Sequence, residues 1–133
     1  MTPRTAAFVY DDALSRHQLS DTHPMKPERL RYTYEILDAY GAFDAPNAMI
    51  VEPRLATEQE VLSYHTEEYL RAVERLSRGE MSSSAATFNF GPGDNPVYEG
   101  MYEAAALSAG STTTEDFVPK TICSTSMNPK RPL

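Results

Sequence analysis

The sequence Phe88-Asn-Phe-Gly-Pro-Gly-Asp-Asn-Pro-Val-Tyr-Glu-Gly-Met-Tyr102 is typical of a loop that leads into a helix. The glycines on either side of Pro92 break regular structure. Pro96 has the fixed φ angle and the missing N–H group that suit the first position of a helix, and Asn95 is then the natural N-cap. The sequence therefore predicts a helix that begins at Pro96 and continues through small residues to Gly110.

Asp94 lies in this loop and is not needed as the helix cap if Asn95 has that role. A carboxylate on a glycine-containing loop, surrounded by aromatic residues, is well placed to accept hydrogen bonds from a ligand. The alternative is a second capping carboxylate that interacts favourably with the helix dipole. The residues taken alone favour this structural role.

Composition limits what the chain can be. Its 133 residues are 41% hydrophobic and 23% charged, which is enough for one ordinary domain. A formal net charge of −7 argues against a nucleic-acid partner. A single cysteine, Cys123, excludes an internal disulfide framework and predicts a cytoplasmic location. No segment approaches the roughly 20 apolar residues of a membrane span, so we expect a soluble chain with no membrane partner.

Two short apolar runs predict strands. Residues 5–10 (Thr-Ala-Ala-Phe-Val-Tyr) fit a buried parallel strand, and residues 49–51 (Met-Ile-Val) predict a second one. Asp11 and Asp12 follow the first strand directly. Ligands bind at the carboxyl ends of parallel strands, but the sequence favours these two carboxylates as turn formers.

Helix signals occupy most of the remaining chain. Pro27 predicts a helix that ends near Tyr40, before Gly41. Two capping threonines predict further helices, and the small polar residues 81–87 predict a flexible crossing. The predicted buried face of the first helix consists of Leu30, Tyr34 and Leu37, and the capped helices are residues 58–64 after Thr57 and 67–78 after Thr66.

Arg29 lies in the first turn of the helix that begins at Pro27. A cation there is at the unfavourable end of the helix dipole, which hints at another task for the guanidinium group. The alternative is a solvated side chain, which the residues alone favour. His17, His23 and His65 lack the spacing of a zinc motif, and a lone histidine is usually structural.

Three segments, residues 23–31 (His-Pro-Met-Lys-Pro-Glu-Arg-Leu-Arg), 64–70 (Tyr-His-Thr-Glu-Glu-Tyr-Leu) and 88–100, resemble the N-terminal signature blocks of histone deacetylases. They are most similar to the class that includes bacterial acetoin utilisation proteins. The resemblance covers about Phe8 to Thr113. It implies an incomplete α/β fold of the arginase/deacetylase type, with a parallel sheet between helical layers and, in the family, zinc at the strand ends.

The resemblance also implies roles for two residues. Asp94 matches the rim aspartate that accepts hydrogen bonds from backbone amides of the acetyl-lysine substrate. Arg29 matches the arginine that lines the internal channel through which acetate is thought to leave. Both roles reverse the preference drawn from the residues alone. The implied activity is zinc-dependent deacetylation of acetyl-lysine or a related acylated amine.

The sequence departs from the family's pattern after Thr113, where it continues Thr-Glu-Asp-Phe-Val-Pro-Lys. The family's paired histidines, its zinc ligands and its catalytic tyrosine have no counterpart here. We therefore predict a deacetylase-like N-terminal part over residues 1–113 and an unrelated, disordered tail over residues 114–133. No catalytic or metal-ligating residue is predicted, and we expect the chain to bind no zinc.

Two functions remain open at this point. One is a truncated segment of a deacetylase that is inactive alone. The other is a non-catalytic binding or regulatory protein derived from a deacetylase. The oligomeric state and the acyl substrate are left open.

Overall fold

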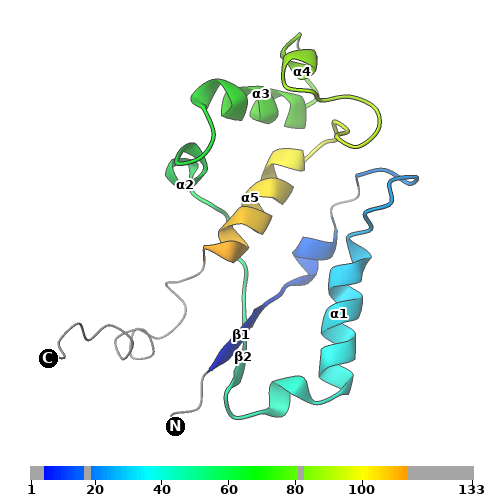
Figure 1. Ribbon diagram of the computed structural model, residues 1–133, viewed down its shortest axis with the longest axis vertical. Coiled ribbons are helices and arrows are strands. Elements are labelled where there is room, and N and C mark those ends of the chain that lie inside the picture. The colour runs from blue at the N-terminus through cyan, green and yellow to red at the C-terminus, as the bar shows by residue number, and fades with distance from the viewer. Residues whose placement is uncertain (1–4, 17–18, 81–82, 114–133) are drawn as a thin grey trace, which may run out of the picture.

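The computed structural model describes residues 5–16, 19–80 and 83–113, and Figure 1 shows their arrangement. The predicted tail (residues 114–133) and His17 lie outside the described residues. Two strands lie beside the first long helix, and the remaining helices gather beyond the end of the second strand. In chain order the elements are β1 (Ala6–Val9), the short 3₁₀ helix η1 (Asp12–Ser15), α1 (Glu28–Ala39), the 3₁₀ helix η2 (Ala42–Asp44), β2 (Ala48–Val51), α2 (Glu58–Leu62), α3 (Glu67–Ser77), α4 (Ser84–Thr87) and α5 (Met101–Thr112).

Strands β1 and β2 form a parallel pair, as the sequence predicts. The register runs from Ala6 opposite Ala48 to Val9 opposite Val51. Parallel neighbours need a crossover connection, and α1 supplies it. The pair and its helix therefore form a β-α-β unit, which confirms the predicted α/β class.

The two carboxylates after β1 act as turn formers, as predicted. Asp11 Oδ1 accepts a hydrogen bond from the backbone N–H of Ala13 at 2.8 Å. Asp12 Oδ1 accepts one from the hydroxyl group of Tyr10, also at 2.8 Å. Burial and this bond raise the pKa of the Tyr10 phenol.

Aromatic rings hold α1 against the strands. Tyr34 stacks on Tyr10 with ring centroids 4.4 Å apart and planes only 6° from parallel. Phe43, in η2, contacts both Phe8 and Tyr34, with centroid distances of 5.5 Å and 5.4 Å. Ring pairs at such distances stabilise a fold beyond the area that they bury. The rings therefore fix the position of α1 without a fully buried residue in the helix.

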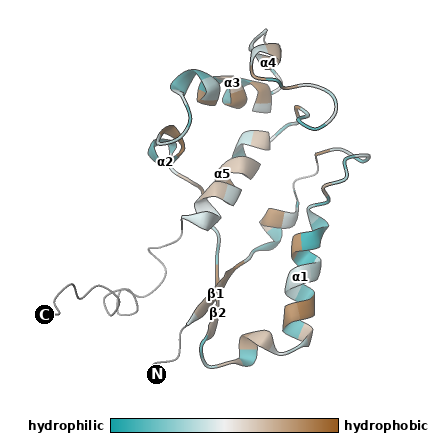
Figure 2. Ribbon diagram, viewed as in Figure 1, coloured by the Kyte–Doolittle hydropathy of each residue, from teal (hydrophilic) through white to brown (hydrophobic). Residues whose placement is uncertain are grey.

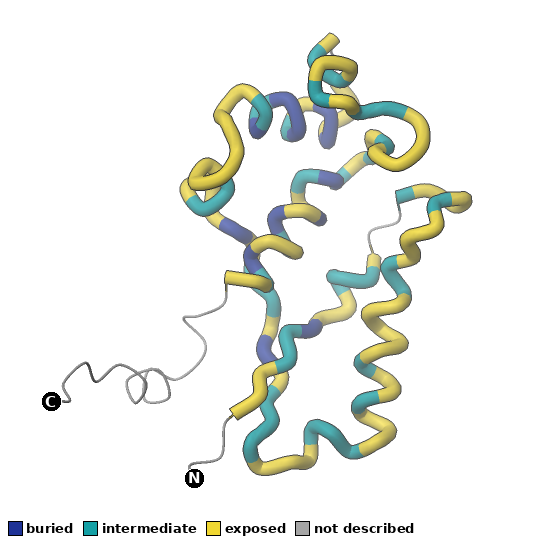
Figure 3. The backbone as a smooth tube through the Cα atoms, in the orientation of Figure 1, coloured by how far each residue is buried: buried dark blue, intermediate teal, exposed yellow. Residues whose placement is uncertain are grey.

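The predicted buried face of α1 is only partly correct. Tyr34 and Leu37 are half-buried, but Leu30 is exposed, and no residue of α1 is classed as buried. Figure 3 shows this contrast, because buried positions appear on α3 and α5 but not on α1. Leu30 instead lines an open hollow beside α5. The helical spacing of Leu30, Tyr34 and Leu37 therefore marks an apolar side of α1, but the described residues do not cover Leu30.

The second part of the fold is built on α3. Its predicted N-cap, Thr66, accepts a hydrogen bond from the backbone N–H of Tyr69. Val73 and Leu76 pack with Met101 of α5 into a buried cluster. The predicted capping box of α2 is also present, since Thr57 and Glu60 exchange both bonds.

Helix α5 begins at Met101, so the predicted start at Pro96 is wrong. Gly100 precedes it in the left-handed conformation, with φ at 78°, which glycine adopts without strain. The cap comes from α3, because Ser77 Oγ accepts the N–H of Tyr102 at 3.1 Å. The same hydroxyl donates to Glu103 Oε2 at 3.1 Å. A distant side chain thus caps the helix, and a local capping signal could not reveal it.

The predicted flexible crossing is also partly wrong, because residues 84–87 form the short helix α4. Phe88 N–H donates to the carbonyl of Ser84 at 3.1 Å, and Phe90 N–H donates to that of Ala85 at 2.8 Å. Alanine has the highest intrinsic helix propensity, so the two alanines in this stretch favour the turn over an open coil. Residues 81–82 lie outside the described ranges.

The small side chains of α5 allow the chain to cross it closely. Figure 2 shows most of α5 in pale shades of intermediate hydropathy. The N–H of Ala56 donates to the carbonyl of Ala106 at 2.8 Å. A Cβ atom built on Gly110 would lie 2.0 Å from the carbonyl oxygen of Arg54 and 2.5 Å from the nitrogen of Ala56. Only glycine fits at that crossing.

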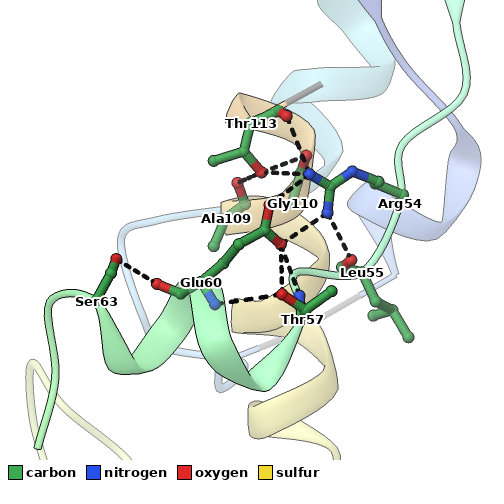
Figure 4. A network of polar contacts seen from close by, with 8 residues as sticks. All are labelled: Arg54, Leu55, Thr57, Glu60, Ser63, Ala109, Gly110 and Thr113. Atoms are coloured by element: carbon green, nitrogen blue, oxygen red, sulfur yellow. Dashed lines mark hydrogen bonds and ion pairs between the residues drawn. The ribbon is translucent and has the colours of Figure 1, made fainter. Parts of the chain in front are cut away.

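The same crossing carries a polar network (Figure 4). Arg54 forms a bidentate ion pair with Glu60, with N–O distances of 2.8 Å and 2.6 Å. It also donates to the carbonyl oxygen of Thr113 at 3.0 Å, just beyond the end of α5. An arginine at this position donates a hydrogen bond to a carbonyl group at the end of the helix, and its positive charge interacts favourably with the negative end of the helix dipole. The network therefore ties α2 to the C-terminus of α5.

None of the helices within residues 5–16, 19–80 and 83–113 is long and apolar enough to cross a membrane.

We predict that Gly110→Ala destabilises the chain by about 1–3 kcal/mol, because the added methyl group would overlap backbone atoms that are fixed by the Ala56–Ala106 bond. Urea denaturation followed by circular dichroism measures the change. Gly91→Ala is the matched control, since a Cβ at Gly91 meets no atom within 4 Å. Equal stability of the two variants would contradict the close approach of the backbone of residues 54–56 to Gly110.

We also predict a pH dependence from the network. Arg54 and the capping bonds lower the pKa of Glu60 from 4.5 to about 2. A carboxyl group with a lowered pKa in the folded state stabilises the fold above pH 4.5, and this stabilisation is lost as the pH falls toward 2. The difference in unfolding free energy between the wild type and Glu60→Gln should therefore shrink over this range. Glu99→Gln removes an exposed carboxylate outside the network. This variant should change the free energy of unfolding only slightly at either end of the pH range.

Candidate functional site

The loop between α4 and α5 is anchored at both of its ends. Phe90 and Tyr98 both pack against the buried cluster that α3 and α5 form. The ring of Phe90 also stacks on that of Tyr69, with centroids 6.0 Å apart. The seven residues between the two anchors, 91–97, form the exposed part of the loop. Aromatic packing thus holds this segment away from the core.

Asn95 braces the exposed part instead of capping a helix. Its side-chain nitrogen donates to the carbonyl of Asn89 at 3.1 Å, and its own carbonyl accepts the N–H of Gly91 at 3.0 Å. Asn89 has a φ angle of 58°, in the left-handed region that asparagine tolerates better than most residues. Gly93 is left-handed as well, with φ at 110°. These bonds close the loop on itself.

Asp94 lies on the exposed side of this closed loop. Its carboxylate makes no hydrogen bond or ion pair with any of the described residues. Because α5 begins seven residues later, at Met101, Asp94 does not cap that helix. The capping alternative considered from the sequence is therefore wrong, and none of the described residues occupies the acceptor positions of this carboxylate.

A hollow of about 370 Å³ brings the Asp94 loop next to the segment around His23. The two segments are some 70 residues apart in the sequence, yet they form opposite parts of one lining. The lining is made of Ser20, Thr22, His23 and Pro24 from one segment and Pro92, Gly93, Asp94 and Pro96 from the other.

His23 has a structural bond on one ring nitrogen. Its Nδ1 accepts the backbone N–H of Met25 at 3.1 Å, which shapes the turn before α1. Its Nε2 is buried and has no hydrogen-bond partner among the described residues. His23 therefore shapes the wall of the hollow through its bond to the backbone of Met25.

Arg29 lines a different hollow, of about 230 Å³, between the start of α1 and the face of α5. Its guanidinium group is exposed and makes no hydrogen bond or ion pair within the described residues. By contrast, Arg31 pairs with Glu35 at 3.5 Å. The structure thus separates the two predicted residues, since Asp94 and Arg29 line different hollows.

His65 lies at the edge of a third hollow, of about 140 Å³, between α2, α3 and α5. Its ring stacks on Tyr69 with centroids 5.0 Å apart. Within the part of the chain that the structure describes, no three His, Cys, Asp or Glu side chains converge as a metal site would require. The described residues therefore do not fit a zinc ion.

A model of the histone deacetylase domain matches residues 23–122 of the chain. The chain belongs to the histone deacetylase family. The match includes the His23 segment, the helices α1 to α5 and the Asp94 loop, and therefore both Arg29 and Asp94. It also includes residues 114–122, so the domain boundary at Thr113 stays a prediction. The parallel strands and their crossover are consistent with part of an arginase/deacetylase-type fold.

Individual relatives agree with this assignment. The acetoin utilization protein AcuC of Bacillus subtilis is 35% identical over 112 residues, which are 84% of this chain and 28% of that protein. Histone deacetylase 1 of Homo sapiens is 32% identical over 114 residues, or 84% of this chain and 23% of its own length. Type-1 histone deacetylase 1 of Dictyostelium discoideum is 30% identical over 115 residues. The chain thus spans about a quarter of the length of these relatives.

Sequence reasoning missed some residues that shape the site. Tyr98 and Ser108 line the hollow of Arg29, but neither stood out in the sequence. Tyr98 was treated only as one aromatic residue near Asp94, and Ser108 as one of the small residues of a helix.

Proposed function

We propose that this chain supplies the substrate-binding rim of a zinc-dependent deacetylase that acts on acetyl-lysine or a related acylated amine. The observation that carries the proposal is the state of Asp94. Its carboxylate is exposed, has no bond within the described residues, and lies on a loop that is anchored by Phe90 and Tyr98. Family membership supplies the class of substrate.

Asp94 would recognise the backbone of the substrate. An ionised carboxylate only accepts hydrogen bonds, and its two oxygens can accept two amide N–H groups at once. Such charge-assisted bonds are stronger than bonds between neutral groups. The hollow between Asp94 and the His23 segment offers room for an extended peptide beside the carboxylate. Asp94 would therefore orient the acylated side chain and take no part in proton transfer.

Arg29 would contact the carboxylate product. Its guanidinium group has no bond with a described residue, and the wall around it is mainly apolar. A cation in such a wall attracts a small anion more strongly than it would in open water. The product of deacetylation, acetate, is such an anion.

The hydrolytic step would need groups that the described residues do not bring together. Zinc would supply a Lewis acid and an activated water molecule in this family. We infer that this chain binds the substrate but does not hydrolyse it alone. The second candidate function, a non-catalytic binding or regulatory protein, is favoured by the same combination of a free rim carboxylate and no converging metal ligands among residues 5–16, 19–80 and 83–113.

We predict that Asp94→Asn lowers kcat/KM about tenfold or more, because an amide replaces a charge-assisted acceptor that is worth roughly 1.5–3 kcal/mol. The test uses a chimera in which residues 23–113 replace the matching segment of human histone deacetylase 1. The melting temperature should change little, since the carboxylate has no bond within the described residues, and the zinc content should stay the same.

Glu99→Gln is the control for this prediction, because Glu99 is an exposed carboxylate on the same segment that lines neither the rim hollow nor the Arg29 hollow. It should leave kcat/KM unchanged. A large fall in melting temperature with near-normal catalysis in Asp94→Asn would return Asp94 to a structural role. A folded chimera without activity would also contradict the proposal.

We further predict that the purified 133-residue chain binds no stoichiometric zinc and has no deacetylase activity, because its described residues bring no three metal ligands together. Metal analysis after dialysis measures the zinc content, and an assay with an acetyl-lysine peptide measures the deacetylase activity. One tightly held zinc ion per chain would overturn this expectation.

A further inference from the structure

The hollow between α2, α3 and α5 has room for a molecule the size of one aromatic ring. Its volume is about 140 Å³. Apolar cavities on the order of 150 Å³ bind benzene. The described lining of this hollow contains no Asp, Glu, Lys or Arg side chain. Its aliphatic part consists of Val61, Leu70, Val73, Ala105, Ala106 and Ala109.

The hollow is present because α5 is held at both ends and has small side chains between them. Near its start, Met101 packs against Val73 of α3. Just beyond its end, the carbonyl of Thr113 accepts a hydrogen bond from Arg54, which also pairs with Glu60 of α2. The alanines that line the hollow lie between these two anchors. The anchors keep α2 and α3 from closing onto the alanines, so the space is formed before a ligand arrives.

Ring side chains that contact one another form one edge of the hollow. The imidazole ring of His65 stacks on the ring of Tyr69, with centroids 5.0 Å apart and an angle of 26° between the planes. The ring of Tyr64 meets the imidazole edge-on, also with a centroid distance of 5.0 Å. Aromatic rings gain from such stacked and edge-to-face contacts beyond the area that they bury. This edge therefore favours an aromatic ligand over an aliphatic one of the same size.

His65 also supplies a polar group at this edge. Its imidazole makes no hydrogen bond with a described residue, and a neutral imidazole has one donor and one acceptor nitrogen. The other polar side chains of the described lining are the phenols of Tyr69 and Tyr102. Burial raises the pKa of the Tyr102 phenol, and the nearby charge of Glu74 acts in the same direction, so this hydroxyl group is uncharged at neutral pH. A charged ligand would therefore lose its hydration here without gaining a partner of opposite charge.

We propose that this hollow is a binding site for a small uncharged phenol, whose ring lies over the alanines of α5 and whose hydroxyl group forms a hydrogen bond with the imidazole of His65. In small-molecule sites, apolar walls supply most of the contact and a few polar groups fix the orientation of the ligand. The three helices supply the walls, and His65 supplies the orienting group. The site goes beyond the proposed function, because it requires neither the Asp94 loop nor a metal ion.

Titration of the full chain with phenol, followed through its methyl signals by nuclear magnetic resonance, tests the proposal. Val73 and Ala106 line this hollow, whereas Ala104 and Val97 line other hollows. Phenol should shift the signals of Val73 and Ala106 saturably and leave those of Ala104 and Val97 unchanged. Benzoate has the same ring but a negative charge, and it should give no saturable shift of Val73 and Ala106.

A variant that fills the hollow tests the place of the ring. Ala109→Leu puts a larger apolar side chain into the space and should abolish the saturable phenol shifts with little change in melting temperature. Ala109→Val is a smaller filling and should weaken phenol binding in the same direction. Ala39→Leu, at an exposed alanine of α1, is the matched control and should leave phenol binding unchanged.

A second variant tests the hydrogen bond. His65→Phe keeps a ring that can stack on Tyr69 and removes the imidazole nitrogens. The ratio of phenol affinity to benzene affinity should fall about fivefold, the effect of one lost hydrogen bond between neutral groups. Tyr64→Phe is the control, because Tyr64 contacts His65 but does not line the hollow. It should leave the ratio unchanged.

Three results would overturn the proposal. The first is a shift of Ala104 and Val97 equal to that of Val73 and Ala106. The second is unchanged phenol affinity in both variants of Ala109, and the third is an unchanged ratio of phenol to benzene affinity in His65→Phe. None of these results bears on the substrate rim, because the Asp94→Asn experiment measures catalysis in a chimera and phenol binding is measured in the chain itself.

Discussion

The rest of the structure depends on the bond between Ser77 and the first turn of α5, which joins that helix to the end of α3. Ser77 is the last residue of α3, and its hydroxyl group accepts the N–H of Tyr102. Its carbonyl oxygen also accepts the N–H of Gly100 at 3.2 Å. Since Ser77 is only 4% exposed, water hardly competes for these bonds. The start of α5 is thereby fixed against the end of α3, and the cluster of Val73, Leu76 and Met101 forms between the two helices.

The positions of both hollows follow from this arrangement. Phe90 and Tyr98 dock on the same cluster, so the loop that carries Asp94 must project from it. At the other end of α5, the chain crosses at Gly110, and Arg54 links the helix terminus to Glu60. With both ends held, the outer face of α5 becomes one wall of the hollow beside Arg29. The functional surfaces are therefore consequences of how one small-residue helix is held.

Features that depend on neighbouring residues could be predicted from the sequence. The caps Thr57 and Thr66 were correct because each bonds to a residue three positions away. The start of α5 was not, because its capping hydroxyl group comes from Ser77, 25 residues before the N–H that it accepts from Tyr102. The predicted burial of Leu30 was wrong for a related reason. A helical period marks the apolar side of a helix but does not show which residues, if any, cover that side.

The candidate site shows the same limit. Asp94 and Arg29 were identified through the resemblance of their surrounding motifs, and the residues alone favoured a structural role for each. That they line separate hollows could not be foreseen, because each hollow joins segments about 70 residues apart. The places of Tyr98 and Ser108 in the lining of the Arg29 hollow could not be foreseen either, because that lining joins α5 to residues near the start of α1.

The anchoring of Phe90 and Tyr98 has a thermodynamic consequence for any molecule that binds at Asp94. Ordering a free loop on binding costs on the order of 1–2 kcal/mol per residue in backbone entropy. Here the seven intervening residues are closed by the bonds of Asn95 to Asn89 and Gly91 before a ligand arrives. The entropy of that segment is already lost when the chain folds. A ligand of Asp94 would therefore meet a loop that is already ordered, and the main entropic cost of ordering would fall on the ligand itself.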